Sequence, residues 1–385
     1  MQVYRRGDAG PAVAEIRAKL AVLGLLPASR VGDLVLSDTD ARFDTDCDRA
    51  VRGFQQARGL NVDGMVGPET YRALDEARWR LGDRLLSHTV SHPFTGDDVV
   101  ELQQRLLDMG FDSGRCDGIF GRRTDAALRE FQRNVGLAPD GTCGPTTLRA
   151  LAQLAQTPAV GGHPQLLRES ELLHRAGPAL VGKVVVLDPG HGGPDRGSSA
   201  NGLEEAALVE NLAARLEGRL AATGVRVFLT RGPDGGPTDA ARAAFANSCE
   251  ADLLLSLHVD EDRSCNARGL ATYYYGNVWS GARGAASPVG ERLAGLLQRE
   301  LVARTGLADC RTHPKMWDLL RWTRMPAVRV ELGYLTSDVD AALLATPRFR
   351  DTVAEAFLVA IQRLYLPPES DVETGTLRLS SVLAV

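Results

Sequence analysis

Histidine and glutamate stand at points along the chain where strands of a buried sheet would be expected to end. His191 follows the run KVVVLDPG, His258 ends LLLSLH, and Glu331 is the last but one residue of AVRVEL. The carboxyl ends of parallel strands meet at one edge of a sheet, and open α/β sheets bind ligands outside that edge. We therefore expect these three side chains to converge on one rim of a sheet.

The types of these residues indicate metal chemistry. Two neutral imidazoles and one carboxylate form a set that suits tetrahedral Zn²⁺ and leaves a fourth position for water. A further carboxylate is available from Glu204 or Glu205, which open the long helical pattern after His191. Zinc lowers the pKa of bound water to about 7, so the set predicts a hydrolytic site with a spare carboxylate for proton transfer.

The elements that would position these residues alternate between strand and helix. Helical patterns such as EAALVENLAARLEGRLAATG separate short runs that are rich in Val and Leu. These runs lie at 183–187, 225–229, 253–257 and 327–330. Such alternation predicts an α/β fold, a mainly parallel sheet with helices on both faces.

A repeat precedes this domain. The segment FQQARGLNVDGMVGPETYRAL, from Phe54, aligns without a gap with FQRNVGLAPDGTCGPTTLRAL, from Phe131. Apolar residues three and four apart predict one more helix ahead of each copy, and the first copy has a longer loop, SRVGDLVLSDTDARF, after that helix. The D-G-x-x-G-P turn suits a tight loop followed by a helix that starts at proline. We expect two small three-helix modules.

The predicted organisation has five parts. The two repeats are expected at 1–80 and 90–156, a linker at 157–180, the α/β domain at 181–366, and a poorly ordered tail at 367–385. The linker contains TPAVGGHPQ, which is rich in Pro and Gly, and SELLHRAG, which could form a short helix. The two small modules therefore precede the α/β domain, which carries the candidate catalytic residues.

Composition narrows the choice of partners. The chain has 385 residues, with 44% hydrophobic and 24% charged residues, as ordinary globular proteins have. Its formal net charge of −5 gives no reason to expect nucleic acid as a partner, and no apolar run is long enough to span a bilayer. No secretory signal is recognisable at the start. We expect a cytoplasmic protein, or one in the cell envelope if another route exports it.

The six cysteines show neither CxxC nor zinc-finger spacing. Scattered reduced thiols are the expectation. Cys116 and Cys143 lie in matching loops of the second module, so a disulfide between them is the alternative.

Four motifs together resemble the amidase 3 family. They are DPGHGGPDRG, GLEEAALVENLAARL, ADLLLSLH and MPAVRVELGYLTS, in that order. The resemblance implies zinc-dependent hydrolysis of the amide bond between N-acetylmuramic acid and L-alanine in peptidoglycan or muropeptides. It implies His191, Glu205 and His258 as zinc ligands, and Glu331 as the catalytic glutamate.

The resemblance also favours Glu205 over Glu204 as the ligand, because leucines follow Glu205 at the family's helical offsets. It gives Arg242 and Asn247, in AARAAFANS, a supporting role. Asp195 is interpreted as a turn residue that braces the metal loop, and a bond from it to a ligand is the alternative. The stretch after His258 departs from the family's His-Ala-Asn, which bears on substrate positioning.

Aromatic residues near these motifs have a less defined role. Trp317 could stack on a sugar, although packing is the expectation, and His313 lies close to the cleft by the same resemblance.

The repeats resemble the peptidoglycan-binding domain 1 family, which implies wall anchoring. The same domain order without a signal also resembles actinobacterial amidase-like regulators. That resemblance implies an alternative function, a cytoplasmic regulator of peptidoglycan precursor synthesis that acts through a protein partner.

Overall fold

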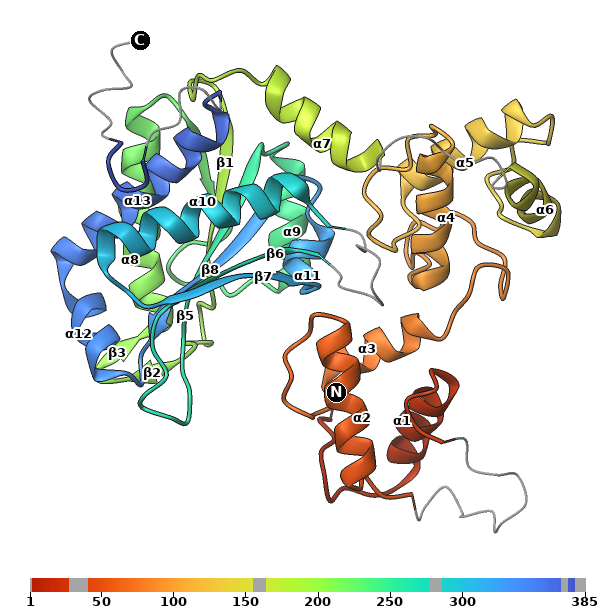
Figure 1. Ribbon diagram of the computed structural model, residues 1–385, viewed down its shortest axis with the longest axis horizontal. Helices are drawn as coiled ribbons and strands as arrows, with labels where there is room; N and C mark the ends of the chain where they lie inside the picture. Colours follow the sequence, from red (N-terminus) through yellow and green to blue (C-terminus); the bar gives the residue numbers. More distant parts are fainter. Residues whose placement is uncertain (1, 28–40, 155–163, 277–285, 368–372, 378–385) are drawn as a thin grey trace. The chain divides into compact units, whose positions relative to one another are not determined.

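The computed structural model describes residues 2–27, 41–154, 164–276, 286–367 and 373–377 (Figure 1). The chain divides into two compact units. One contains residues 1–168 with 277–285, and the other contains residues 169–276 with 286–385. Each is described by itself. Within the described residues, no helix is long and apolar enough to cross a membrane.

The first unit contains two modules of three helices, as the sequence predicts. The helices are α1 Pro11–Val22, α2 Thr45–Ala57, α3 Pro68–Ala77, α4 Asp97–Asp108, α5 Arg122–Asn134 and α6 Pro145–Leu154. Each module has an apolar core of its own, centred on Phe54 in the first and Phe131 in the second. Most of the longer loop predicted for the first copy lies outside the described residues.

A buried glutamine organises the repeated turn. The amide of Gln132 donates to the carboxylate of Asp140 at 2.8 Å and to the carbonyl of Thr142 at 3.1 Å. Its carbonyl oxygen accepts the N–H of Gly141, which has a φ of +73°. Gln55 makes the equivalent bonds in the first module. The Gln of each F-Q pair therefore holds the D-G turn of the same repeat through hydrogen bonds.

The second unit is built on a sheet with the strand order β4-β1-β5-β8-β6-β7. Its strands are β1 Val184–Pro189, β4 Arg226–Leu229, β5 Leu253–Asp260, β6 Leu270–Tyr275, β7 Asp309–Lys315 and β8 Ala327–Tyr334. All neighbours are parallel except β6 and β8. The mainly parallel sheet is confirmed. A small antiparallel pair, β2 Ser199–Ala200 with β3 Leu203–Glu204, lies outside it.

Helices cover both faces of this sheet. The helices α8 Glu205–Ala222, α10 Pro288–Thr305 and α13 Pro347–Tyr365 share one apolar core with alternate side chains of β1, β5 and β8. Side chains alternate between faces along a strand, so Asp188 and Ser256 face the other way, and Arg242 of α9 Asp239–Ser248 bonds Asp188 there. The short helix α11 Asp318–Trp322 packs beside α9, and α12 Asp338–Ala345 packs against α13.

The structure adds detail to two of the predicted parts, the linker and the tail. Helix α7, Pro164–Arg175, occupies half of the predicted linker. In the predicted tail, the N–H of Gly375 donates to the Glu300 carboxylate of α10 at 3.1 Å, and Arg304 donates to the carbonyl of Leu377 at 2.7 Å. Residues 373–377 of the predicted tail thus contact α10.

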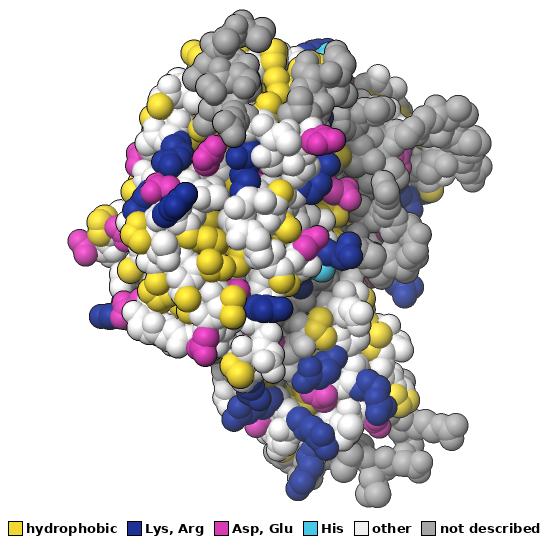
Figure 2. Space-filling view, turned by 60° about the vertical axis from the view of Figure 1, so that its left-hand side comes forward, with side chains coloured by type: hydrophobic (Ala, Val, Ile, Leu, Met, Phe, Trp, Pro, Cys, Tyr) yellow, Lys and Arg dark blue, Asp and Glu magenta, His cyan; other side chains and the backbone are white. Residues whose placement is uncertain are grey.

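The cysteines are all free thiols, so the alternative disulfide between Cys116 and Cys143 does not form. Both side chains are buried. Burial raises the pKa of the Cys143 thiol to about 12, which leaves it protonated and unreactive near neutral pH. Figure 2 shows basic and acidic side chains interspersed over the visible face of the molecule.

Candidate active site

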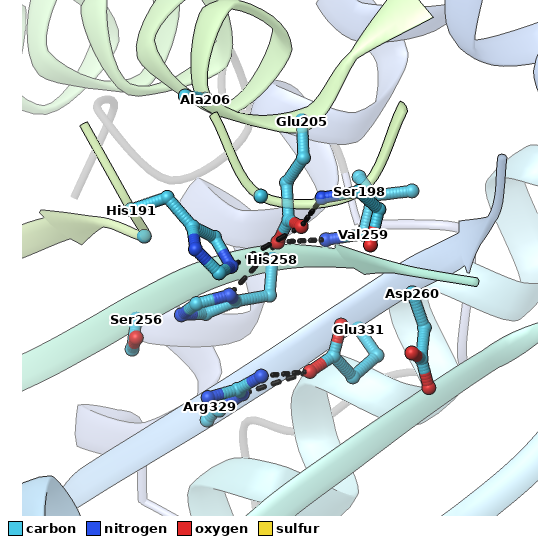
Figure 3. A network of polar contacts seen from close by, with 12 residues as sticks. His191, Ser198, Glu205, Ala206, Ser256, His258, Val259, Asp260, Arg329 and Glu331 are labelled. Carbon is cyan, nitrogen blue, oxygen red and sulfur yellow. Dashed lines mark hydrogen bonds and ion pairs between the residues drawn. The ribbon is translucent and has the colours of Figure 1, made fainter. Parts of the chain in front are cut away.

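Three of the predicted residues meet at the carboxyl ends of β1 and β5 (Figure 3). His191 lies in the loop after β1, His258 lies near the end of β5, and Glu205 is the first residue of α8. One side-chain nitrogen or oxygen from each lies within 4.8 Å of the others. His258 Nδ1 is 2.9 Å from Glu205 Oε1, and His191 Nε2 is 3.2 Å from Glu205 Oε2.

The structure separates the two adjacent glutamates. The Glu205 side chain is 2% exposed, and its carboxylate accepts the backbone N–H groups of Ser198 at 2.9 Å and Val259 at 3.1 Å. The Glu204 side chain is 44% exposed and pairs with Arg196 at 2.6 Å. Only Glu205 faces the two imidazoles, because the start of α8 turns successive side chains in different directions.

Asp195 orients the first histidine. Its Oδ2 lies 2.8 Å from His191 Nδ1, and backbone bonds between Gly192 and Asp195 close the short loop that brings it there. Because His191 Nδ1 is engaged by this contact, His191 Nε2 is directed toward Glu205. The bond to a candidate ligand, the alternative role for Asp195, is therefore present in the structure.

Glycines make the room for these side chains. A Cβ atom on Gly190 would lie 2.1 Å from the His258 ring. One on Gly197, where φ is +64°, would lie 2.5 Å from the Glu205 carboxylate and 2.7 Å from the His191 ring. His191 itself has a φ of 55°, a left-handed conformation that non-glycine residues seldom adopt. The backbone of His191 is therefore locally strained at this site.

The charges at the site support one another. The hydrogen bond and charge of Glu205, together with Asp195, raise the pKa of His191 to about 9 although burial opposes this. Burial alone would raise the pKa of Glu205, but the hydrogen bonds from His191 and His258 hold it well below its usual range. Glu205 is therefore an ionised carboxylate in a buried place, aimed at two imidazole nitrogens.

Glu331 lies next to this group. Its Cα is the register partner of His258 on the neighbouring strand, and its side chain is only 7% exposed. Glu331 Oε1 accepts from Arg329 Nε at 2.8 Å and Nη2 at 2.6 Å. Among the described residues Glu331 Oε2 is buried with no hydrogen-bond partner. Burial, and then the charge of Glu331, raise the pKa of the neighbouring Asp260 to about 6.

The two residues predicted to support the site do different things. Arg242 lies directly beneath the rim and donates to Asp188 at 2.6 Å and to the carbonyl of His191 at 2.7 Å. Asn247 does not reach the site. It bonds the carbonyl of Trp322 and the N–H of Arg324, so it fixes the chain after α11.

Sequence reasoning missed the role of several neighbours. Asp188 was visible within DPGHGG, but only the structure shows that its buried carboxylate receives Arg242, Ser256 and Thr230. Arg329 could have been noticed as a charge inside a buried strand run, two residues before Glu331 and thus on the same face.

Comparisons with known proteins identify the families that two parts of the chain match. Residues 185–363 match the family described as N-acetylmuramoyl-L-alanine amidase. Residues 9–74 and 95–151 match a putative peptidoglycan binding domain.

Some relatives match the whole chain, and others match about half of it. The chain is 48% identical to the N-acetylmuramoyl-L-alanine amidase CwlM of Mycobacterium tuberculosis over 99% of this chain and 94% of that protein. It is 32% identical to the amidase LytC of Bacillus subtilis over 46% of this chain and 34% of that protein. Among solved structures, the amidase Ami1 of Mycobacterium smegmatis is 25% identical, with a TM-score of 0.43, and the match covers 49% of this chain and 98% of that one.

Proposed function

Because the chain belongs to the N-acetylmuramoyl-L-alanine amidase family, we propose that it hydrolyses the amide bond between N-acetylmuramic acid and L-alanine in peptidoglycan or muropeptides, with Zn²⁺ as its metal. The observation that carries this proposal is the convergence of His191, Glu205 and His258 next to Glu331. Neither the metal nor the roles of these residues follow from family membership alone.

The three side chains fit zinc. Two imidazole nitrogens and one carboxylate match its preferred donors, and the buried Glu205 faces both nitrogens. The space around them depends on Gly190 and Gly197, where a Cβ atom would collide with the donors. His191, Glu205 and His258 would hold the ion. When bound, zinc supplies a water with a pKa of about 7 and polarises the scissile carbonyl.

The residues of the chain carry the proton transfer. Glu331 accepts a proton as water attacks the lactyl carbonyl carbon, and it returns that proton to the nitrogen as the C–N bond breaks. The products are a lactyl carboxylate on the sugar and a free α-amine on L-alanine. Glu331 Oε2 is the oxygen available for this work, since Oε1 receives Arg329. Asp195 keeps His191 Nε2 directed toward Glu205.

The N-terminal modules would bring the substrate to the site. Their match to a putative peptidoglycan binding domain supports this role. The same turn chemistry, made by Gln55 and Gln132, holds the fold of each module, and the ligand would be bound outside that turn.

The experiment uses the purified full chain with a synthetic muramoyl-L-alanyl peptide. Zinc-dependent release of L-alanine amino termini is expected, with loss of activity in Glu205→Gln. Glu204→Gln is the matched control, because the Glu204 carboxylate is adjacent in sequence but is exposed and paired with Arg196. Absence of zinc-dependent release from the unmodified chain would refute the hydrolase. The alternative regulator, acting through a protein partner, predicts a folded chain without this activity.

A further inference from the structure

An aromatic and cationic surface lies next to the candidate base. We define it by Tyr273 of β6, His313 and Lys315 of β7, Trp317, and Arg329 of β8. The Tyr273 ring lies 4.7 Å from the Trp317 ring and 5.7 Å from the His313 ring, between centroids. The Arg329 guanidinium lies 4.7 Å from the Trp317 centroid, and the Lys315 ammonium lies 5.4 Å from it.

Sheet register explains why this surface adjoins the site. Tyr273 is the register partner of Arg329 on β8 and of His313 on β7, so the three side chains share one face. Glu331 follows Arg329 by two positions and therefore shares this face as well. The surface thus extends from Glu331 across β6 to β7, on the face opposite the apolar core of α8, α10 and α13.

The contact between Arg329 and Glu331 is incomplete as an ion pair. Both donors, Nε and Nη2, point at the single oxygen Oε1. The favoured pairing of a guanidinium with a carboxylate engages both oxygens. Among the described residues, the Arg329 guanidinium has no hydrogen bond other than those to Glu331, and its side chain is 29% exposed, against 7% for Glu331. The guanidinium therefore has N–H donors left for a second carboxylate, and its side chain is partly open to solvent.

The surroundings of Trp317 indicate an anion rather than a sugar. Sugar stacking needs an open ring face, but two cations and the Tyr273 ring crowd this indole. An aromatic face holds a guanidinium in a fixed plane. Trp317 therefore orients Arg329, and Lys315 adds a second positive charge beside it.

We propose that Arg329, oriented by Trp317 and supported by Lys315, binds a free carboxylate of the substrate's stem peptide. This inference rests on the proposed amidase function and assigns a substrate preference to the same site. When the peptide carboxylate engages the guanidinium, one of the two donors leaves Oε1 of Glu331. Arg329 is then a specificity-determining residue that also positions Glu331.

The first test measures binding without turnover. The ligands are two L-alanyl dipeptides, products of the proposed reaction, which differ only in whether the second residue has a free α-carboxylate or a primary amide. Calorimetric titration of the zinc-loaded full chain should show about tenfold tighter binding of the acid, the effect of one charged hydrogen bond. Arg329→Met should remove this preference, and Arg329→Lys should keep part of it.

The second test measures kinetics on the corresponding muramoyl dipeptides. The acid should have the lower KM in the unmodified chain, and Arg329→Met should equalise the two KM values. A role in holding Glu331 alone predicts a changed kcat for both substrates with an unchanged acid-to-amide ratio, and that result would overturn the proposal. Arg292→Met, an exposed arginine of α10, is the control.

The outcomes separate the two proposals. A binding preference that depends on Arg329, without any hydrolysis, supports the carboxylate site and refutes the amidase. Hydrolysis of both substrates with no difference in binding or KM supports the amidase and refutes the carboxylate site. If Arg329→Met does not fold by circular dichroism, Lys315→Met tests the same site and should reduce the preference for the acid.

Discussion

Two clusters of polar side chains are buried at the carboxyl ends of the same strands, and they differ in how completely they are paired. The lower cluster consists of Asp188, Thr230, Arg242 and Ser256. Asp188 Oδ1 accepts from Thr230 and Arg242, and Oδ2 accepts from Ser256 at 2.7 Å. Its carboxylate is fully satisfied inside the protein.

The upper cluster is the rim site, His191, Glu205, His258 and Glu331. Here Glu331 Oε2 has no partner among the described residues, and the Glu205 carboxylate faces two nitrogens able to bind a metal. Buried polar groups are normally hydrogen-bonded, so the unpaired oxygen of Glu331 calls for a reason, and the proposed proton transfer supplies one. The comparison therefore separates a cluster whose carboxylate is fully hydrogen-bonded from one that keeps an unpaired carboxylate oxygen, the oxygen to which we assign proton transfer.

The largest expected effect is on the chemistry of the rim site. Glu331→Gln should lower kcat by about 10²–10⁴-fold, the usual contribution of a positioned general acid–base. Steady-state release of L-alanine amino termini from a muramoyl peptide measures it. The unfolding midpoint should change little, because the amide keeps the shape of the side chain and can still accept from Arg329. A large loss of stability with full activity would contradict the division between the clusters.

The next effect is on the stability of the lower cluster. Asp188→Asn removes the charge opposite Arg242 and leaves a buried guanidinium without compensation, which costs about 3–5 kcal/mol. Both side chains are almost fully buried, at 0% and 5% exposed. Urea denaturation measures the loss of unfolding free energy. Asp234→Asn, at an exposed position, is the control and should change stability by less than about 0.5 kcal/mol.

The sequence predicted the rim site better than the cluster beneath it. His191, His258 and Glu331 were recognisable because polar residues interrupt the ends of apolar strand runs, and the order of four motifs indicated a family. Asp188 lies in one of those motifs, but its partners Thr230, Arg242 and Ser256 come from three other segments. A hydrogen bond between distant segments depends on strand order and register, which local patterns do not contain.

The prediction of the strands was limited in the same way, because it relied on local sequence patterns. The apolar runs of β1, β4, β5 and β8 were predicted, whereas β6 and β7 were not. β7, DCRTHPK, is an edge strand with polar residues and alternating exposure, so no continuous apolar run identifies it. Three of the five residues that define the aromatic and cationic surface, Tyr273, His313 and Lys315, lie on these two strands, and for that reason it was not predicted as a surface.

A smaller effect is expected on zinc affinity when the residue that orients His191 is replaced. Asp195→Ala removes the acceptor for His191 Nδ1, and zinc affinity should fall about 10–100-fold, as for other partners of metal ligands. Competition with a chromophoric chelator measures it. Asp195→Asn keeps one acceptor oxygen and should lose less. Equal affinity in all three proteins would show that the loop orients His191 without Asp195.

The smallest effect tests whether the lower cluster holds its charge cooperatively. Ser256→Ala removes one bond to Asp188, a loss of about 1.5 kcal/mol for a hydrogen bond to a charged group. Burial would raise the pKa of Asp188, but Arg242, and then Ser256 and Thr230, hold it below its usual range. A depressed folded-state pKa contributes stability that is present above the unfolded-state pKa and is lost as pH falls through the folded-state pKa.

The difference between Ser256→Ala and the unmodified chain should therefore be largest near neutral pH and should shrink below about pH 4, the ordinary pKa of an aspartate. Urea denaturation at a series of pH values measures this. Thr352→Ala, on the exposed side of α13, should give a difference that does not vary with pH. A pH-independent cost at Ser256 would mean that the hydroxyl only fills space. The closed cluster would then be held by Arg242 and Thr230, and the contrast with the rim site would rest on the ion pair alone.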